Sequence, residues 1–529
     1  MLRPVSAWID DYRPGGGVYD EMFTADRQVR PAYEQVVGGL ERIDPTEMRT
    51  RVEFLQHIYA DQGVTFDIGG QETPFPLDLL PRIIQPADWA VVEAGVRQRV
   101  AAQERFLADV YGEGDLFRDG VIPRQVVTSS HHFHRAAAGL RPVNDVRIHV
   151  AGIDLIRDPE GRFRVLEDNF RVPSGVSYVM TNRRAITSAL PEVAGEHRIR
   201  PVQTYPSRLR AALTACAPRG IDDPTIVVLT PGVYNSAYFE HALLARMMGV
   251  ELVEGRDLLC QNGHVSVRTT RGLSPVHVIY RRVDDEYLDP SQFRADSLLG
   301  VAGLINAARR GNVTIANAVG NGVADDKLVY TYVGDLIRYY LGQEPVLPGV
   351  DTWRLEEPAH REEVLDRLDE LVVKPVDGSG GKGISIGPAS SRAELDALRQ
   401  RIIDDPRGWI AQPVVQLSTV PTVIDGTLAP RHVDLRPFAI NDGSDVWVLP
   451  GGLTRVALPE GELIVNSSQG GGSKDTWVLE DDSAPEPVVI PNAFVPESIS
   501  LSVQPPDHNM VEPHSKQQEQ QQQGGAGGC

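Results

Sequence analysis

Cysteine and long apolar runs are both scarce in this chain of 529 residues. Its three cysteines, Cys216, Cys260 and Cys529, are too widely separated to match the spacing of a zinc site or a disulfide framework. No run approaches the roughly 18 apolar residues that span a bilayer, and the N-terminus lacks the apolar core of a signal peptide. From these absences we expect a soluble, cytoplasmic protein without a membrane partner.

Positive charge is in short supply too. The chain has 52 Lys and Arg against 72 Asp and Glu, which gives a formal net charge of −20. Because binding of nucleic acid without sequence preference needs concentrated Lys and Arg, we expect no nucleic-acid partner. The length and a hydrophobic content of 41% predict two or three domains with a sizeable core, whereas they leave the oligomeric state open.

A Walker loop is also missing, yet one glycine-rich stretch, LVVKPVDGSGGKGI at 371–384, is suited to phosphate. Residues 371–373 predict a buried strand that delivers Lys374, and 384–386 predict the returning strand, so the dinucleotide fingerprint, which needs a following helix, does not apply. The turn between them supplies Gly378, Ser379, Gly380, Gly381 and Gly383. Glycines let backbone N–H groups approach a polyphosphate, and Lys374 adds a charge, so we expect ATP here. A plain surface hairpin would have the same composition.

A second hairpin is predicted between Arg147 and Asn169, around the turn 158–161. Asp154 lies on its first strand. Glu167 and Asn169 are two residues apart on its second strand, so both side chains leave the same face. Such oxygen ligands suit Mg²⁺, which on a nucleotide takes one or two carboxylates beside water and phosphate oxygens. The alternative is a solvated hairpin with a polar end.

Further candidate residues lie on predicted elements nearer the C-terminus. Lys327 follows an acidic pair at the start of a helix predicted over 325–341. Gln412 lies in a short predicted strand over 409–413, of the kind that can run beneath an adenine ring. A strand over 431–436 would present His432, Asp434 and Arg436 on one face, and Arg455 follows in a later polar series.

The middle of the chain predicts a βαβ unit, with strands at 225–229 and 250–253 and a helix over 235–248. A long amphipathic helix is predicted over 87–110. The tract Arg281–Asp285 suggests surface ion pairs, or a grip on a substrate carboxylate. The histidines of 131–134 have no acidic or thiol partner at ligand spacing, so packing or substrate contact is favoured over zinc.

Taken together, these stretches resemble the circularly permuted ATP-grasp type 2 proteins, a family similar to the synthetase part of glutathionylspermidine synthetases. The residues that carry the resemblance are 75–84, VLEDNFRVPSGVSY at 165–178, 230–258, VADDK at 323–327, 371–384, RHVDLRPF at 431–438 and 452–479. The likeness is called permuted because the metal hairpin precedes the lysine strand and glycine flap, the reverse of an ordinary ATP-grasp enzyme.

The resemblance implies an α/β (α+β) fold: a circularly permuted ATP-grasp with an inserted Rossmann-like pre-ATP-grasp lobe. The expected parts are an N-terminal region with the magnesium hairpin (1–200), the lobe (201–322), the nucleotide-binding part (323–479) and a tail (480–529). The composition of the tail, which turns acidic, then proline-rich, then glutamine- and glycine-rich, predicts disorder.

The resemblance also implies roles. Lys374 and Lys327 would contact the phosphates of ATP, and 378–383 would close over them. Mg²⁺ would be held by Asp154, Glu167 and Asn169. The hinge departs from the family pattern, because WIAQPV at 409–414 lacks an acidic residue for the ribose.

The expected activity is that of an ATP-dependent carboxylate–amine ligase, which activates a small-molecule or peptide carboxylate as an acyl phosphate for attack by an amine. Arg436 and Arg455 are the candidates to stabilise the developing charge. Two alternatives stay open: a scaffold that binds ATP without turnover, and a small-molecule kinase. The sequence does not identify the carboxylate or the amine.

Overall fold

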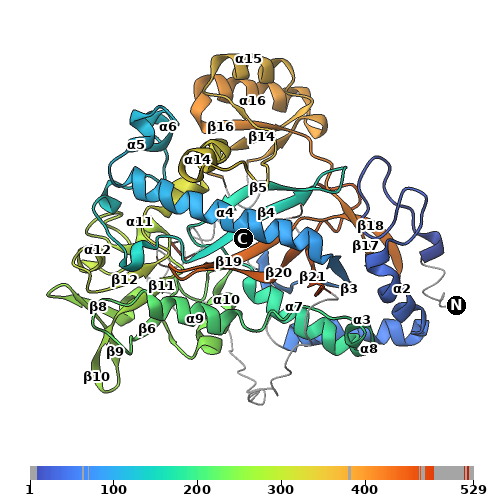
Figure 1. The fold of residues 1–529 in the computed structure, drawn as a ribbon, viewed down its shortest axis with the longest axis horizontal. Helices are drawn as coiled ribbons and strands as arrows, with labels where there is room; N and C mark the ends of the chain where they lie inside the picture. Colours follow the sequence, from blue (N-terminus) through green and yellow to red (C-terminus); the bar gives the residue numbers. More distant parts are fainter. Residues whose placement is uncertain are drawn as a thin grey trace.

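The computed structural model of the chain describes residues 9–61, 65–68, 71–378, 383–463, 465, 471–481, 518, 521 and 522. Within these residues the fold is mixed α/β, as the sequence predicts, and it is built around several separate sheets (Figure 1). No helix in the described part of the chain is both long enough and apolar enough to cross a membrane.

The largest sheet has six strands in the order β3-β21-β20-β19-β4-β5. Their bounds are β3 Leu77–Ile84, β4 Val150–Arg157, β5 Phe163–Asn169, β19 Arg436–Asn441, β20 Val446–Val456 and β21 Gly472–Val478. Only β21 and β3 are parallel neighbours; the other pairs are antiparallel. The sheet therefore joins segments from both halves of the chain.

Two helices cover opposite faces of this sheet. Helix α4 (Pro86–Val110), the long helix predicted by apolar spacing, packs in a cluster with Ala439, whereas α7 (Val176–Ala189) packs with the neighbouring side chains Phe438 and Ile440. Successive side chains of a strand point to opposite faces, so each strand of the sheet supplies both layers of the core.

The predicted metal hairpin is present as β4 and β5, in which Asp154 lies opposite Glu167 and Gly152 opposite Asn169. The glycine-flap strands are also confirmed. Strand β14 (Leu371–Pro375) pairs antiparallel with β15 (Ser385–Ile386) and with β16 (Trp409–Pro413), and β13 (Trp353–Arg354) completes this four-stranded sheet.

Helices α15 (Pro358–Asp366) and α16 (Arg392–Asp404) lie over the flap sheet at the top of Figure 1. Helix α16 begins where the sequence supplies a capping box: Ser391 accepts from the N–H of Glu394, and the Glu394 carboxylate accepts from the N–H of Ser391. The predicted flap residues Ser379, Gly380 and Gly381 lie outside the described residues.

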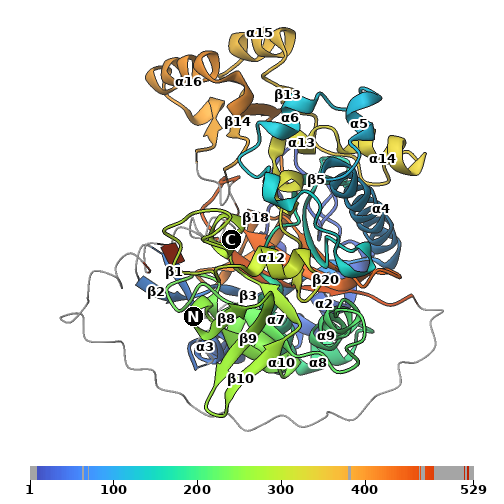
Figure 2. The same cartoon turned by 90° about the vertical axis from the view of Figure 1, so that its left-hand side faces the viewer.

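The predicted βαβ unit forms one end of a parallel sheet with the order β12-β11-β6-β7. Its strands are β6 Ile226–Leu229, β7 Glu251–Val253, β11 Val278–Arg281 and β12 Thr314–Ala316, and α10 Tyr238–Met248 connects β6 to β7. A three-stranded antiparallel sheet, β8 Leu258–Gln261, β9 His264–Thr269 and β10 Gly272–Val276, extends from it (Figure 2).

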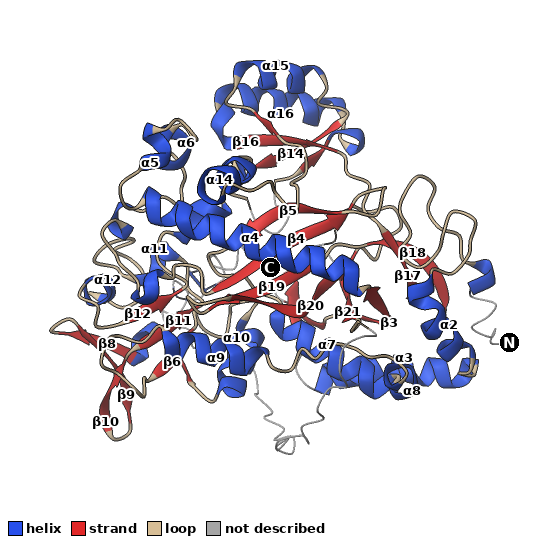
Figure 3. Cartoon of the chain, in the orientation of Figure 1, coloured by secondary structure: helices blue, strands red, loops and turns tan. Residues whose placement is uncertain are grey.

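The remaining α-helices and strands lie around these four sheets, and most of them are labelled in Figure 3. They are α2 Glu34–Glu41, α3 Pro45–Asp61, β1 Thr65–Ile68, β2 Gln71–Pro74, α5 Asp115–Arg118, α6 Arg124–Thr128, α8 Pro191–Gly195, α9 Tyr205–Ala215, α11 Asp285–Leu288, α12 Leu304–Arg309, α13 Lys327–Tyr330, α14 Val333–Leu341, β17 Thr419–Ile424 and β18 Thr427–His432.

Two predicted elements are wrong in detail. The helix expected over 325–341 is divided into α13 and α14, because Arg354 donates to the carbonyl oxygen of Thr331 between them (3.2 Å). The strand expected over 431–436 is divided too. The chain leaves the two-stranded β17–β18 sheet after His432, whose ring contacts the carbonyl of Leu417, and enters the large sheet at Arg436.

Candidate active site

A cleft with about 470 Å³ of open space lies between the metal hairpin and the flap sheet. It is lined by His132, Glu167, Asp168, Asn169, Arg171, Val172, Asp325, Lys327, Asp377 and Gly378. The structure thus brings the hairpin and the start of the glycine flap, which are far apart in the sequence, to one cavity.

Glu167 and Asn169 share the face of β5 that the alternation of a strand predicts. Asp168 between them is buried and forms a two-bond ion pair with Arg99 (2.6 and 2.9 Å). The Glu167 carboxylate, by contrast, is 28% exposed, and its ion-pair partners among the described residues are distant: Lys327 Nζ at 3.6 Å and Arg436 Nη2 at 3.8 Å. This carboxylate is therefore accessible from the cleft.

Asn169 carries an unsatisfied amide. Its Nδ2 atom is buried and has no hydrogen-bond partner among the described residues. A buried amide nitrogen without a partner costs free energy, and the two ends of an amide side chain are interchangeable by rotation. Asn169 therefore fits a position that a bound ligand completes.

Asp154 is fully occupied within the protein. Arg436 donates to both of its oxygens (2.5 and 2.8 Å), and Arg455 Nη2 donates to Oδ2 (2.6 Å). Burial alone raises the pKa of Asp154, but the charges of the two arginines outweigh it and hold the pKa below its usual range. Asp154 is thus a fixed carboxylate.

The two arginines are buried beside Glu167. Arg455 also donates to Asp434 through Nε at 3.0 Å, so two cations and two anions form one compact group, which we call the arginine cluster (Asp154, Asp434, Arg436 and Arg455). Gly152 on β4 makes room for it, because a Cβ there would lie 3.3 Å from Arg436 Cδ.

Lys327 joins the two sides of the cleft. Its Nζ donates to the carbonyl oxygen of Gly378 at the start of the flap and lies 3.6 Å from Glu167 on the hairpin. Its backbone N–H donates to the carbonyl of Val376 (3.0 Å), and Asp326 caps its helix by accepting from the N–H of Leu328 (2.9 Å). The lysine is therefore held at the point where hairpin and flap meet.

Lys374 is the second lysine of this region. Its Nζ donates to Gln412 Oε1 (2.7 Å), and Gln412 Nε2 donates to Thr352 (3.0 Å), so the side chain of Gln412 positions the lysine. The pKa of Lys374 is lowered to about 8, mainly by burial; the charge of Glu167 opposes this shift, and the charge of Lys327 contributes to it. A buried ammonium group beside a second lysine is suited to an anionic ligand.

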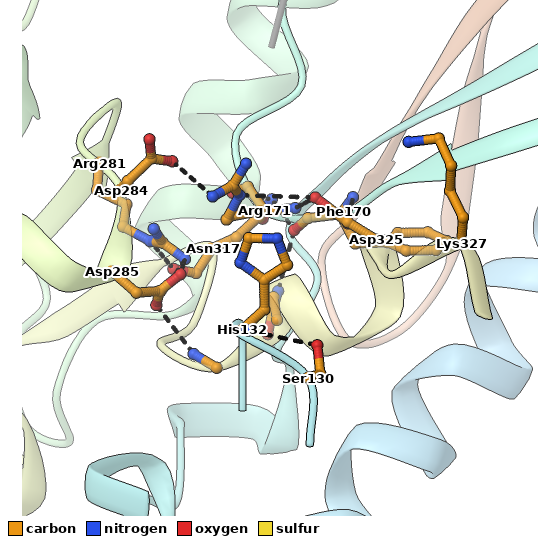
Figure 4. A network of polar contacts seen from close by, with 12 residues as sticks. Ser130, His132, Phe170, Arg171, Arg281, Asp284, Asp285, Asn317, Asp325 and Lys327 are labelled. Carbon is orange, nitrogen blue, oxygen red and sulfur yellow. Dashed lines mark hydrogen bonds and ion pairs between the residues drawn. The ribbon is translucent and has the colours of Figure 1, made fainter. Parts of the chain in front are cut away.

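Sequence reasoning singled out neither Arg171 nor Asp325 as a site residue, although both line the cleft (Figure 4). Arg171 pairs with Asp284 at 3.2 Å and lies 3.8 Å from Asp325. Asp325, which was expected to help cap a helix, instead accepts from the N–H of Phe170 (2.6 Å), and burial raises its pKa to about 7. The position of Arg171, two residues beyond Asn169, was the signal available in the sequence.

His132 is the one histidine of 131–134 that lines the cleft. Burial, and then the charge of Arg171, lower its pKa to about 3, so the ring is neutral at pH 7.

The arginines of the tract Arg281–Asp285 are not on the surface as expected. Arg281 is buried in an ion pair with Asp285 and Arg282 in one with Glu240, both at 3.2 Å.

A family model described as circularly permuted ATP-grasp type 2 matches residues 81–457. The chain belongs to this family. The resemblance carried by the sequence motifs is confirmed, and ATP-grasp proteins generally use ATP and Mg²⁺.

Several relatives share most of this ATP-grasp chain. A protein of Mycobacterium tuberculosis is 59% identical over 501 residues, which cover 94% of this chain and 91% of that protein. A Synechocystis protein is 48% identical over 476 residues, 89% of this chain and 99% of its own length. A Frankia alni protein, whose name proposes a glutamate–cysteine ligase, is 46% identical over 475 residues, 89% of this chain but 54% of that protein.

A solved structure supports the ATP-grasp fold. The glutathione synthetase-like effector from Globodera pallida, in apoform, has a TM-score of 0.55, and the match covers 83% of this chain and 98% of that one. The sequence identity is 11%, so the likeness concerns the fold alone.

A bound metal in this ATP-grasp cleft would need ligands from outside the protein. No group of three or more His, Cys, Asp or Glu side chains in the described ranges is arranged to hold a metal ion. Asp154 is already occupied by two arginines, which leaves Glu167 and Asn169 as the accessible pair. Mg²⁺ on a nucleotide commonly takes one or two carboxylates and completes its shell with phosphate and water, so these residues fit that ion.

Proposed function

We propose that this ATP-grasp protein is an ATP-dependent carboxylate–amine ligase whose ATP phosphates bind in the cleft between hairpin and flap. The observation that carries the proposal is the bridging position of Lys327, whose Nζ contacts the flap at Gly378 and lies 3.6 Å from Glu167. A cation held between a glycine-rich flap and an accessible carboxylate suits a metal-bound polyphosphate.

The phosphate site would use Lys327, Lys374 and the flap, including Gly378 and Gly383. Lys374 is held by Gln412, and its depressed pKa reflects mainly the burial of the ammonium group, whose charge a bound phosphate would stabilise. Mg²⁺ would be held by Glu167 and Asn169, with Asp154 behind them, and would supply charge neutralisation at the transferred phosphoryl group.

The reaction would proceed in two balanced steps. An oxygen of the substrate carboxylate attacks the γ-phosphorus, the bond to the β-phosphate oxygen breaks, and ADP leaves with an acyl phosphate formed. The amine nitrogen then attacks the acyl carbon, an amide C–N bond forms, and phosphate leaves as the nitrogen loses a proton. The protein positions the reactants and stabilises the developing charge.

Arg436 and Arg455 would stabilise that charge, and their location beside Glu167 supports this role. Both are already paired with carboxylates, so they would act as fixed positive groups. At the other end of the cleft, Arg171 and neutral His132 would contact the substrate carboxylate. We propose small-molecule or peptide substrates, and no nucleic-acid or membrane partner.

The name of the Frankia relative agrees with a ligase but does not select the substrate. The alignment covers a little over half of that protein, so its name does not have to refer to the aligned part. Glutamate and cysteine therefore belong in a substrate screen beside other amino acids, short peptides and polyamines.

An ADP-release screen with Mg²⁺ and ATP tests the proposal. Release that depends on both a carboxylate and an amine, and that Lys374→Ala abolishes, is the expected result. Arg367→Ala is a matched control, because Arg367 belongs to the same part of the molecule but is 43% exposed and pairs with Glu370. Mass spectrometry of the product separates an amide from the phosphorylated product of a kinase. ATP binding without ADP release from any pool would favour a scaffold and would end the ligase proposal.

A further inference from the structure

Two residues of the glutamine-rich tail are buried against the parallel-sheet lobe. Gln521 and Gln522 are 5% and 4% exposed, and this dark red segment lies beside the green lobe in Figure 2. The sequence predicts a disordered tail, and most of it lies outside the described residues. At these two residues the structure differs from that expectation.

Hydrogen bonds account for the burial. Gln521 Oε1 accepts from the backbone N–H of Leu298 (2.8 Å), and Gln521 Nε2 donates to the carbonyl of Asp296 (2.7 Å). Gln522 Oε1 accepts from the N–H of Tyr234 (3.2 Å), and its backbone carbonyl accepts from Asn235 Nδ2 (3.2 Å). Each glutamine side chain is thus contacted by the lobe's own backbone.

The pattern of donors and acceptors selects a carboxamide. Gln521 faces an N–H with its oxygen and a carbonyl with its nitrogen, so glutamate would place a negative oxygen against the carbonyl of Asp296. A buried acceptor facing another acceptor costs the full desolvation of both groups. The site therefore distinguishes glutamine from glutamate.

The pocket around Gln522 is shaped by the lobe itself. Gly232 has a φ of 122°, and a Cβ there would lie 2.6 Å from Gln522 Nε2, so only glycine leaves space for this side chain. Asn235 is held independently of the tail, because its Oδ1 accepts from the N–H of Ala237 (3.0 Å). The loop that contains Gly232 and Asn235 therefore keeps the shape of this pocket through its own contacts.

The location is one where α/β sheets bind ligands. Residues 230–235 follow β6 at the carboxyl end of the parallel sheet. At the same edge Arg282 follows β11, its N–H donates to the carbonyl of Leu229 (2.7 Å), and its guanidinium donates to Pro173 (2.7 Å) near the cleft. Asp284, two residues further on, pairs with Arg171, which lines the cleft.

We propose that this edge of the lobe is a binding site for a peptide segment with two adjacent glutamines, and that the chain's own tail occupies it through Gln521 and Gln522. A free peptide with the same pair of carboxamides competes for the site. This proposal does not depend on ligase activity, because it concerns binding at a surface outside the nucleotide cleft.

Hydrogen exchange in the full chain tests the proposal at the donors themselves. In the double variant Gln521→Glu with Gln522→Glu, a carboxylate oxygen replaces the amide nitrogen that donates to the carbonyl of Asp296, and this repulsion should expel the tail. The N–H groups of Tyr234 and Leu298 then have no acceptor from the tail, and we expect the segments that contain them to exchange about tenfold faster. The variant Gln518→Glu carries a charge in the same tail, and we expect wild-type exchange. Unchanged exchange in the double variant would overturn the proposal.

A peptide of residues 515–527 added in trans supplies the second measurement. We expect it to restore protection of both segments in the double variant, whereas the same peptide with glutamate at 521 and 522 does not. Gly232→Ala should block the peptide, and Gly220→Ala, at another glycine of positive φ with open space around it, should not. Equal protection by the two peptides would show that the site does not recognise glutamine. Failure of the ADP screen would leave both measurements unaffected.

Discussion

Two regions that meet at one hairpin, the arginine cluster and the cleft, give their carboxylates opposite environments. In the arginine cluster, Asp154 is 1% exposed and accepts three hydrogen bonds from guanidinium groups. One strand away, facing the cleft, Glu167 is 28% exposed and has cations only at 3.6 and 3.8 Å. A saturated carboxylate stabilises the fold, whereas a partly satisfied one is available to a ligand. Mutation of Asp154 should therefore lower stability, whereas mutation of Glu167 should lower activity.

Asp154→Asn should give the largest effect. Removing one partner of a buried ion group leaves uncompensated charge, so we expect the free energy of unfolding to fall by about 3–5 kcal/mol. Urea denaturation measures the change. Asp115→Asn, which breaks an exposed pair with Arg118, is the control and should have little effect. A loss no larger than that of the control would remove the distinction between the two regions.

Glu167→Gln should act on turnover. If the carboxylate holds Mg²⁺, its loss should lower ATP-dependent turnover by about 10²–10³. The free energy of unfolding should change by less than about 1 kcal/mol, because the lost ion contacts are long, at 3.6 and 3.8 Å, and Glu167 is partly exposed. Steady-state kinetics and urea denaturation of one preparation give both values. If Glu167→Gln were active but as unstable as Asp154→Asn, Glu167 would be a residue that stabilises the fold and not one that binds the ligand.

Lys374→Ala should weaken ATP binding by roughly 1.5–3 kcal/mol, the range for a hydrogen bond to a charged group. Stability should stay constant or rise slightly, because burial of the ammonium group is unfavourable, as the depressed pKa indicates. Calorimetric titration with ATP measures the affinity. Wild-type affinity in a folded variant would exclude Lys374 from the nucleotide site.

His149 tests whether an unsatisfied polar group marks a binding site by itself. The ring is fully buried, neither nitrogen has a hydrogen-bond partner among the described residues, and burial lowers its pKa to about 4. Below the unfolded pKa of about 6.5 the unfolded state binds more protons, so stability should fall by about 2 kcal/mol between pH 7 and about pH 5.

In His149→Phe this contribution should be absent, and ATP affinity at pH 7 should be unchanged. Urea denaturation at the two pH values measures the first expectation. A variant that loses as much stability as the wild type on acidification would show that His149 is not the titrating group. An unsatisfied atom indicates a ligand site only where, as at Asn169, it also lies in an open cleft.

Truncation after Leu479 should have the smallest effect. The tail has little apolar surface to bury, and the described contacts that it loses are a few hydrogen bonds of Gln521 and Gln522 and the ion pair of Glu480 with Arg198. The melting temperature should therefore change by only about 1–2 °C. Calorimetry of the truncated and full-length chains measures it. A drop comparable to that of Asp154→Asn would show that the tail is part of the core.

The predictions from sequence held where the determinants are local. The two-residue spacing of Glu167 and Asn169 was enough to place both on one face, and the apolar run before Lys374 was enough to predict its strand. They failed where contacts between distant segments determine the local structure. The break between α13 and α14 depends on Arg354 bonding to Thr331, a contact that helical periodicity cannot reveal.

The same limit applies within the candidate site. Asp154 was expected to be a metal ligand beside Glu167, and its place opposite Glu167 followed from the hairpin. The hairpin did not reveal that Arg436 and Arg455 bind Asp154, because these arginines come from strands far along the chain. Arg171 was missed for a related reason: its partners Asp284 and Asp325 lie on other elements.

The strand order of the large sheet has a consequence for biosynthesis. Within that sheet β3 has one neighbour, β21, and the register pairs Leu77 with Ser473. A ribosome completes β3 early and β21 only after nearly all the other described residues, so the nascent chain carries β3 without its partner for most of translation. Such unpaired edges are a recognised starting point for aggregation. Any translation product that ends before β21 therefore leaves this edge open.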